Sequence, residues 1–187
     1  MQQNGGGNRI NGLAELIHQA ERGPAPVELW DPPYCGDIGL KISADGVWHY
    51  LGSPIRRERL TKLFARVLKR EEDGRHYLVT PVEKVDVAVE DAPFIAVEME
   101  QRGAGREQTL IFRTNVDDIV VCGPEQPLRF EADKAHGGCK PYITVRRRLE
   151  ALVSRALTYD LLDLAVPSEA QPEVMGVWSG GAFFAIA

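Results

Sequence analysis

Apolar and polar residues alternate along most of the 187-residue chain, and the period of this alternation changes from segment to segment. A period of two is typical of a strand with one buried face. It predicts strands over residues 37–43, 47–52, 76–80, 82–90, 94–100, 109–114, 118–123 and 127–133, and a closing hairpin over 174–187. Asp45-Gly46, between the first two strands, is a strong hairpin signal.

A period of 3.6 residues predicts amphipathic helices in three other segments. A short helix is expected over residues 11–22. A longer helix is expected to start at Ser53-Pro54 and to run over residues 55–71. A second long helix is expected over residues 145–162, where one side carries Leu149, Leu152, Val153, Ala156 and Leu157.

The two long helical segments resemble each other in sequence. RRERLTKLFARVL, residues 56–68, recurs in altered form as VRRRLEALVSRAL, residues 145–157. Six of the twelve positions from Arg57 to Leu68 are identical at a fixed offset of 89. Any two amphipathic helices share leucines at such spacing, so chance is one explanation. The shared arginines, with a strand pair and a proline before each segment, favour a duplicated β-β-α-β unit instead.

Each such unit leaves one apolar sheet face that needs cover. We therefore predict an α+β fold with two related subdomains and mostly antiparallel sheets, because the short connections leave little room for parallel crossovers. The predicted division is a flexible head and N-terminal helix over residues 1–24, a first repeat subdomain over 25–92 and a second over 93–187.

Four stretches carry a resemblance to a known family: DGVWHYLGSPIRRERL, HYLVTPVEKVDVAVEDAPF, FRTNVDD and PYITVRRRLEALVSRA. Read in this order, they resemble the proteobacterial family known as domain of unknown function 1285, over about residues 30–160. The resemblance implies a duplicated two-part α+β fold whose C-terminal half is superficially like pleckstrin-homology barrels. It also implies a candidate binding surface between the halves, and no known activity.

Charge and composition narrow the function classes. The 22 Lys and Arg against 27 Asp and Glu give a net charge of -5, which argues against binding duplex nucleic acid with the whole surface. No apolar run reaches the ~20 residues of a bilayer span, and the N-terminus lacks a signal-peptide pattern. Three widely spaced cysteines form neither a disulfide framework nor a CxxC pair. We therefore expect a cytoplasmic protein with no membrane span.

The sequence lacks a recognisable set of residues for catalysis or for binding a metal or cofactor. His136 and Cys139 form a lone HxxC pair, which is too little for a metal site. No GxSxG, GxxxxGK[ST] or GxGxxG motif is present, and Ser179 falls in a predicted hairpin turn. Lys84 and Asp86 share the polar face of a predicted strand. We predict no metal, no cofactor and no catalytic residue.

Arg57 and Arg146 occupy equivalent positions of the repeat, in the first turn of each predicted helix. The helix macrodipole disfavours a cation in the first turn by ~0.3–1 kcal/mol. Because an arginine nevertheless occupies this position in both segments, we expect it to have a function. Each arginine either pairs with a carboxylate of the opposite half, such as Glu83 or Asp91, or binds an anionic ligand. Both interpretations predict a groove between the halves lined by Arg57, Glu83, Asp91, Arg113, Asn115, Tyr142 and Arg146.

The leading functional hypothesis is a non-catalytic binding or adaptor module that holds an unknown protein or a small anionic ligand in this groove. An alternative is binding of single-stranded nucleic acid or another polyanion through a basic helix face from Arg59 to Arg70, with Trp48 or Tyr50 as stacking surfaces. The acidic net charge counts against that alternative. An acid–base enzyme that uses carboxylates of the groove ranks lowest.

Overall fold

The computed structural model describes residues 25–135 and 137–186. Contacts within the chain divide it into two compact units, with the boundary between Asp91 and Ala92. We call them the N-terminal and the C-terminal unit and describe each by itself. The helix expected over residues 11–22 lies outside the described residues.

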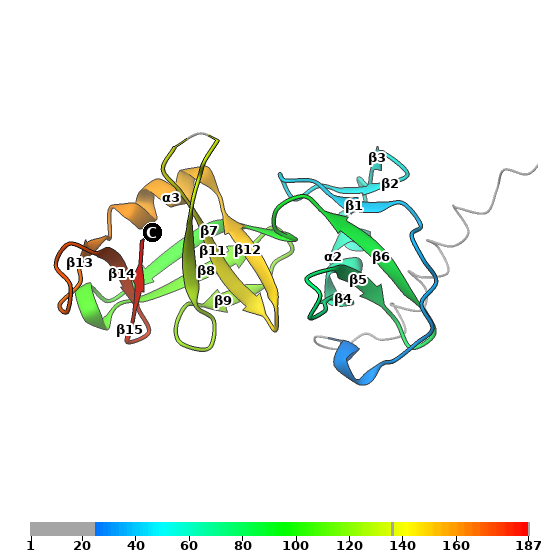
Figure 1. Cartoon of the computed structure of the whole chain (residues 1–187), viewed down its shortest axis with the longest axis horizontal. Coiled ribbons are helices and arrows are strands. Elements are labelled where there is room, and N and C mark those ends of the chain that lie inside the picture. The colour runs from blue at the N-terminus through cyan, green and yellow to red at the C-terminus, as the bar shows by residue number, and fades with distance from the viewer. Residues whose placement is uncertain (1–24, 136, 187) are drawn as a thin grey trace, which may run out of the picture. The chain divides into compact units, whose positions relative to one another are not determined.

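In residues 25–91, the part that the structure describes, the N-terminal unit contains one six-stranded sheet and one α-helix (Figure 1). Its strand order is β3-β2-β1-β6-β5-β4, and the β1–β6 pair is parallel while the other pairs are antiparallel. The elements are η1 (Val27–Leu29), β1 (Leu40–Ile42), β2 (Trp48–Tyr50), β3 (Ser53–Pro54), α2 (Glu58–Arg66), β4 (Leu68–Arg70), β5 (His76–Val79) and β6 (Lys84–Val89).

The core of the N-terminal unit forms where the apolar side of α2 meets the sheet. In β6, Val85 and Val87 are buried while Asp86 between them is only partly covered, which confirms the predicted separation of strand faces. Phe64 of α2 is fully buried, and its ring centroid lies 5.7 Å from that of Trp48 in β2. Each such side chain contributes ~1.5–3 kcal/mol by leaving water, so this contact fixes the helix on the sheet.

The C-terminal unit contains a second six-stranded sheet, one α-helix and a small three-stranded sheet. The large sheet has the order β10-β11-β12-β7-β8-β9, and the β7–β12 pair is parallel; the small sheet is β13-β14-β15. The elements are β7 (Phe94–Arg102), η2 (Gly105–Glu107), β8 (Thr109–Thr114), β9 (Ile119–Val121), β10 (Leu128–Ala132), β11 (Cys139–Arg146), β12 (Leu149–Val153), α3 (Arg155–Leu162), β13 (Val166–Pro167), β14 (Met175–Ser179) and β15 (Ala182–Ala185).

The large sheet of the C-terminal unit curls into a half-barrel, which brings β9 near β11. Gln126 bridges these strands, because its side-chain nitrogen donates to the carbonyl of Val145 at 2.6 Å and its side-chain oxygen accepts from the amide of Val121 at 3.3 Å. The small sheet is tied to the same strands through Ser179. Its buried hydroxyl accepts from the amide of Leu110 and donates to the carbonyl of Cys122.

The two large sheets share a strand order, but the predicted β-β-α-β repeat is wrong. In each sheet two three-stranded meanders are joined by a parallel pair between the first and the sixth strand. The helices occupy different places, since α2 lies between the third and fourth strands of its unit and α3 follows the sixth. The likeness therefore lies in whole-sheet topology, and residues 56–68 and 145–157 are not structurally equivalent.

The predicted long helix over residues 145–162 is wrong in its first half, because only Arg155–Leu162 are helical, as α3. Residues 149–153 form β12, in which Leu149, Ala151 and Val153 are buried and the residues between them are not. A turn at Arg147, whose φ is +51°, separates β11 from β12. The LEALV segment satisfies both a helical and a strand period, and pairing with β7 decides in favour of the strand.

The first long helix is shorter than predicted. Ser53 and Pro54 form strand β3 instead of a helix start, and the chain after Arg66 returns to the sheet as β4. The hairpin signal at Asp45-Gly46 is confirmed, because the amide of Ser43 donates to the carbonyl of Val47 across that turn. Within the described residues, no helix is long and apolar enough to cross a membrane.

Candidate functional site

A pocket of about 400 Å³ lies between helix α3 and the loop that joins β10 to β11, and Figure 1 shows these two segments near one another. We call it the α3 pocket. Small-molecule sites commonly have volumes of ~300–1,000 Å³. The lining residues are Asp133, Gly137, Gly138, Cys139, Lys140, Pro141, Leu152, Val153, Arg155, Thr158, Tyr159 and Leu162.

The loop side of the pocket is shaped by backbone hydrogen bonds around Asp133. Its amide donates to the carbonyl of Gly138 at 2.9 Å, and its carbonyl accepts from the amide of Gly137 at 2.8 Å. Its carboxylate accepts from the amide of Ala135 at 3.0 Å. Gly137 and Gly138 have φ values of +74° and +85°, which side-chain-bearing residues rarely adopt. These hydrogen bonds and the two glycines shape the described part of the loop.

The helix side of the pocket comes from the outer part of α3. Leu161 is fully buried and anchors the helix to the unit, whereas Tyr159 remains 59% exposed at the rim of the pocket. The hydroxyl of Thr158 donates to the carbonyl of Ser154 at 3.0 Å, which holds the first turn of the helix. Leu152 and Leu162 add apolar surface between the two sides. The pocket thus combines an apolar wall with a partly exposed aromatic ring.

The charged side chains of the pocket are mainly cationic. Lys140 is partly buried, and Arg155 is exposed at the start of α3. The described residues provide no ion pair to Arg155. Among the described residues of the lining, Asp133 is the one carboxylate, and it accepts a hydrogen bond from within its own loop. The pocket can therefore attract an anion.

The thiol in the pocket is poorly suited to act as a nucleophile. Burial raises the pKa of Cys139 above its ordinary value, so the thiol stays protonated near neutral pH. The HxxC partner His136 lies outside the described residues. Among residues 25–135 and 137–186, no group of three or more His, Cys, Asp or Glu side chains is arranged to hold a metal ion.

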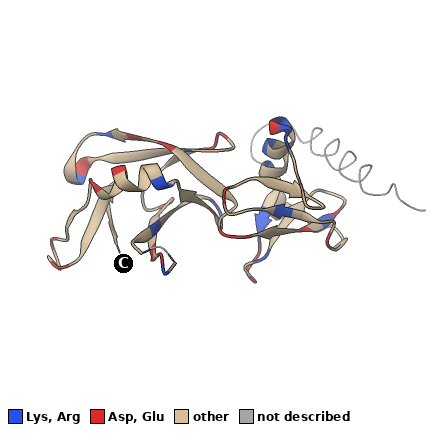
Figure 2. Ribbon diagram, turned by 90° about the horizontal axis from the view of Figure 1, so that it is seen from above, with Lys and Arg blue, Asp and Glu red and all other residues tan. Residues whose placement is uncertain are grey.

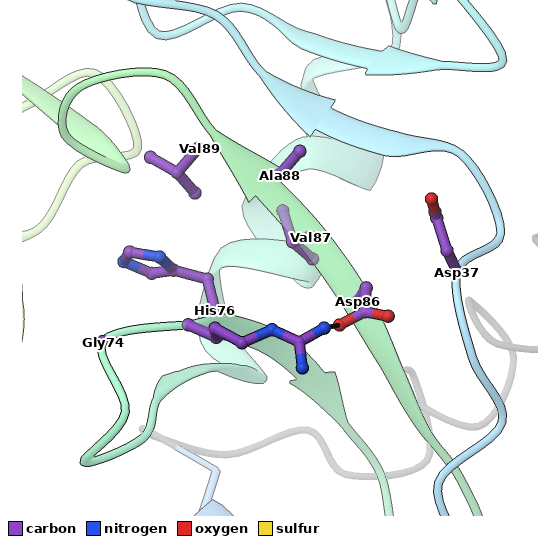
Figure 3. Close-up of a pocket in the computed structure, with 8 residues that line it drawn as sticks. Asp37, Gly74, His76, Asp86, Val87, Ala88 and Val89 are labelled. Carbon is purple, nitrogen blue, oxygen red and sulfur yellow. Dashed lines mark hydrogen bonds and ion pairs between the residues drawn. The ribbon is translucent and has the colours of Figure 1, made fainter.

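A second pocket, also of about 400 Å³, lies in the N-terminal unit and is drawn in Figure 3. Asp86 accepts from the guanidinium of Arg75 at 2.6 Å and from the hydroxyl of Tyr34. The bond to Asp86 raises the pKa of Tyr34. The ring of Tyr77 lies under both Arg75 and Lys84, whose charged groups are 5.3 and 4.8 Å from its centroid. The charged and aromatic groups at this pocket already contact one another, so a ligand would have to displace those contacts.

Three of the predicted site residues belong to the N-terminal unit. Arg57 is exposed at the N-cap position of α2, where its carbonyl accepts from the amides of Leu60 and Thr61. Glu83 lies in the turn between β5 and β6, where its backbone bonds to Thr80. Asp91 is partly exposed after β6. The structure shows no contact among these three side chains.

The other four predicted residues belong to the C-terminal unit, and three lie around the turn between β8 and β9. The Nε atom of Arg113 donates to the carboxylate of Glu98 at 2.8 Å, and its Nη1 atom lies 2.8 Å from the carboxylate of Asp117. Asn115 exchanges hydrogen bonds with the backbone of Ile95. Arg146 pairs with Asp118, which precedes β9. Intramolecular contacts thus engage all three side chains.

Two details of the predicted groove need correction. Arg146 is the last residue of β11 and does not lie in the first turn of a helix, so no macrodipole argument applies to it. Tyr142 is 4% exposed, and the guanidinium of Arg129 lies 4.2 Å from its ring centroid. Arg129 in turn bonds Glu150 at 2.9 Å. The ring of Tyr142 therefore packs inside the unit and offers little surface to a ligand.

The predicted basic helix face is smaller than expected. Lys69 and Arg70 lie on strand β4, outside α2. Trp48 is 2% exposed and packs against α2, so it offers no stacking surface, and Tyr50 is only partly exposed. What remains of the face is Arg59, Lys62 and Arg66 on a helix of nine residues.

Sequence reasoning missed the α3 pocket because it placed the pocket residues on one long helix or in an unassigned loop. The useful signal was the glycine pair Gly137-Gly138 followed closely by the cation Lys140. Recognising β12 would then have put Arg155 and Tyr159 at the start of a separate helix beside that loop.

Comparisons with known proteins agree with this two-unit description. Residues 25–92 match a family model described as "Domain of unknown function (DUF1285), N-terminal domain", and residues 93–186 match "Protein of unknown function (DUF1285), C-terminal domain". Among curated proteins, none matches the chain.

Two solved structures are similar to this chain. A DUF1285 family protein from Silicibacter pomeroyi DSS-3 is 47% identical, with a TM-score of 0.86, and the match covers 94% of each chain. A DUF1285 family protein from Shewanella baltica OS155 is 29% identical, with a TM-score of 0.52, over 67% of this chain and 91% of the other. The chain therefore belongs to the DUF1285 family.

Proposed function

We propose that this protein is a non-catalytic binding module whose C-terminal unit binds a small organic anion with an apolar body in the α3 pocket. The observation that carries the proposal is the composition of that pocket, in which an apolar wall that includes Leu152 and Leu162 meets two cations, Lys140 and Arg155. The groove between the halves and the cytoplasmic location stay predictions from the sequence.

The chemistry of the pocket indicates what kind of ligand it suits. Burying an alkyl chain against Leu152, Val153 and Leu162 contributes ~0.8 kcal/mol for each methylene group that leaves water. A carboxylate gains from Arg155, although an exposed ion pair adds only ~0.2–1 kcal/mol. Apolar burial therefore supplies most of the affinity, and the two cations favour a negatively charged ligand over a positively charged one.

The same geometry supports a binding role over a catalytic one. A nucleophile needs a lowered pKa or a neighbouring base, and burial shifts the pKa of Cys139 in the opposite direction. Acid–base catalysis needs a carboxylate that is available to a substrate, whereas Asp133 caps its own loop. The described part of the pocket thus offers contacts and charge, without a group poised for bond making.

A curled six-stranded sheet followed by one helix, α3, supports a likeness of the C-terminal unit to pleckstrin-homology barrels. In this unit the α3 pocket opens beside that helix. The proposal rests on the pocket residues and does not depend on the likeness.

Isothermal titration calorimetry with three eight-carbon probes tests the proposal on the full chain. Octanoate, 1-octanol and octylammonium have nearly the same apolar body and differ in charge. We expect octanoate to bind with a dissociation constant on the order of 0.1–1 mM, 1-octanol more weakly and octylammonium not measurably. Equal affinity for all three, or no binding of octanoate, would contradict the proposal.

Two single substitutions test whether octanoate binds in the α3 pocket. Arg155→Gln should weaken octanoate about threefold and leave 1-octanol unchanged, because only the charge contact is lost. Arg102→Gln is the matched control, since Arg102 is equally charged, is exposed on β7 and pairs with Glu100 outside the pocket. An equal effect of both substitutions would show that octanoate responds to overall charge and not to the pocket.

A further inference from the structure

Positive charge in the N-terminal unit is concentrated in one short segment. Residues 55–70 contain seven Lys and Arg and one Glu, whereas the rest of residues 25–91 contains three Lys and Arg and eleven Asp and Glu. In Figure 2, blue segments gather on the short helix of this unit. A basic segment within an acidic unit creates a local field that attracts anions.

Part of this positive charge is neutralised within the unit. Lys62 pairs with Glu58 one helical turn away, and Lys69 pairs with Glu28 at 3.2 Å and lies 4.0 Å from Glu71. The side chain of Lys69 is only 18% exposed. These lysines therefore contribute to the structure of the unit more than to its outer surface.

Arg70 is only partly exposed and donates to the carbonyl of Gly74 at 3.3 Å. We call the other four arginines of this segment the arginine surface: Arg56, Arg57, Arg59 and Arg66. All four are exposed, and the described residues form no ion pair with any of them. Arg59 and Arg66 lie on the same side of α2, because seven residues at ~100° each return almost to the starting direction. Arg56 and Arg57 directly precede the first turn of that helix.

The arginine surface fits carboxylates well. A guanidinium is planar and binds a carboxylate with two parallel hydrogen bonds, which a lysine does not offer. Four exposed guanidinium groups within residues 56–66 also add to one local positive potential, which an acidic partner would neutralise. The patch is short, since nine helical residues span ~13 Å.

We propose that the arginine surface docks a short acidic segment of another protein. An extended peptide advances ~3.3 Å per residue, so about four acidic residues span α2. A long nucleic acid carries phosphates along its whole length, whereas residues 25–91 outside the segment 55–70 contain eleven carboxylates and only three cations, which disfavours a polyanion longer than the patch. Trp48 is buried and unavailable to stack on bases, which further favours a peptide.

Fluorescence anisotropy on the full chain tests this proposal with two labelled probes, an octaglutamate peptide and an eight-residue oligothymidylate. At 50 mM salt we expect the peptide to bind, and the Arg59→Gln/Arg66→Gln double variant to weaken it about five- to tenfold. The affinity should fall as salt rises, because the contacts are exposed. The oligothymidylate should bind more weakly than the peptide.

Arg102→Gln/Arg106→Gln is the matched control, since it removes the same charge from exposed positions of the C-terminal unit. The control should leave peptide binding unchanged. No peptide binding at 50 mM salt, equal weakening by both double variants, or tighter binding of the oligothymidylate through Arg59 and Arg66 would overturn the proposal. Thermal unfolding checks the fold of each variant, and the single Arg66→Gln variant repeats the comparison if the double variant melts earlier.

This proposal and the one for the α3 pocket stand independently. The arginine surface lies in the N-terminal unit, and Arg155 lies in the C-terminal unit. Octanoate binding should not change in the Arg59→Gln/Arg66→Gln variant, and octaglutamate binding should not change in Arg155→Gln. Failure of one experiment therefore leaves the other proposal intact.

Discussion

Arg146, the last residue of β11, forms an ion pair with Asp118, which precedes β9, so the pair joins strands that are far apart in the order of the C-terminal sheet. The guanidinium also lies 5.0 Å from the ring centroid of Phe94, and its side chain is only 17% exposed. Gln126 bridges the same two strands. Arg146 therefore helps close the half-barrel, and its role is structural.

Breaking this ion pair should destabilise the protein. Asp118→Asn removes the anion and leaves a mostly buried guanidinium, so we expect the free energy of unfolding to fall by ~1–2 kcal/mol. Urea denaturation measures the change. Glu100→Gln, which breaks the exposed pair with Arg102, should cost at most ~0.5 kcal/mol. An equally small loss of unfolding free energy in both variants would mean that packing alone, and not the ion pair with Asp118, holds Arg146.

Ser179 should be the most sensitive connection between the small sheet and the half-barrel. Its hydroxyl satisfies the buried amide of Leu110 at 2.9 Å and the carbonyl of Cys122 at 2.8 Å. Ser179→Ala leaves both groups without this partner, and we expect a loss of ~2–3 kcal/mol in urea denaturation. Ser168→Ala removes a hydroxyl that bonds only loop amides and should cost less than ~1 kcal/mol. The reverse ranking would contradict this assignment.

Cys122 should make the protein less stable in alkali. Burial raises the pKa of this fully buried thiol to about 11 from an ordinary value of 9.0. The unfolded chain then loses the proton first, so the contribution is fully present below pH 9 and is lost as pH rises through 9 to 11. The loss at pH 11 is ~2 kcal/mol.

Urea denaturation at pH 8 and pH 11 compares the wild type with Cys122→Ala. The variant lacks the titrating thiol, so it should lose ~2 kcal/mol less than the wild type between the two pH values. Tyrosines and lysines titrate equally in both proteins, and the difference isolates Cys122. An identical loss in both would mean that the thiol ionises in the folded state as easily as in the unfolded one.

Cys139 offers a chemical report on the α3 pocket, because it lines the pocket and is partly exposed. Octanoate at saturating concentration should slow the alkylation of Cys139 by iodoacetamide severalfold, by covering the thiol. Cys35 in the N-terminal unit is also partly exposed and should react at an unchanged rate. Peptide mapping by mass spectrometry measures both rates. Protection of Cys35 alone would place octanoate outside the α3 pocket.

Much of the strand content was predictable, because alternation and turn chemistry are local. The Asp45-Gly46 hairpin and the buried Val85 and Val87 of β6 follow from a few neighbouring residues. The closing hairpin, β14 and β15, follows from the apolar residues on either side of Gly180-Gly181. No distant partner is needed to recognise such segments.

The error over residues 145–162 has a physical cause. The turn at Arg147 has a positive φ without a glycine to mark it. Leu149 and Val153 fit both a helix and a strand, and the choice is settled by pairing with β11 across that turn and with β7, more than fifty residues away. The repeat hypothesis depended on that helix.

The candidate site was predictable only in part, for the same reason. Arg113 and Arg146 were singled out for their charge, but their pairing with Asp117 and Asp118 depends on how the turn between β8 and β9 folds. The α3 pocket depends on two elements that the sequence pattern merged or left unassigned.

The central claim is that the α3 pocket binds a small apolar anion, and two-dimensional NMR of the ¹⁵N-labelled full chain tests it most directly. Titration with octanoate should shift the amide signals of Gly138, Thr158 and Tyr159 in a saturable way, and octylammonium should not. Shifts confined to residues around Arg75 and Asp86, or no saturable shift in α3 and the β10–β11 loop, would contradict the claim.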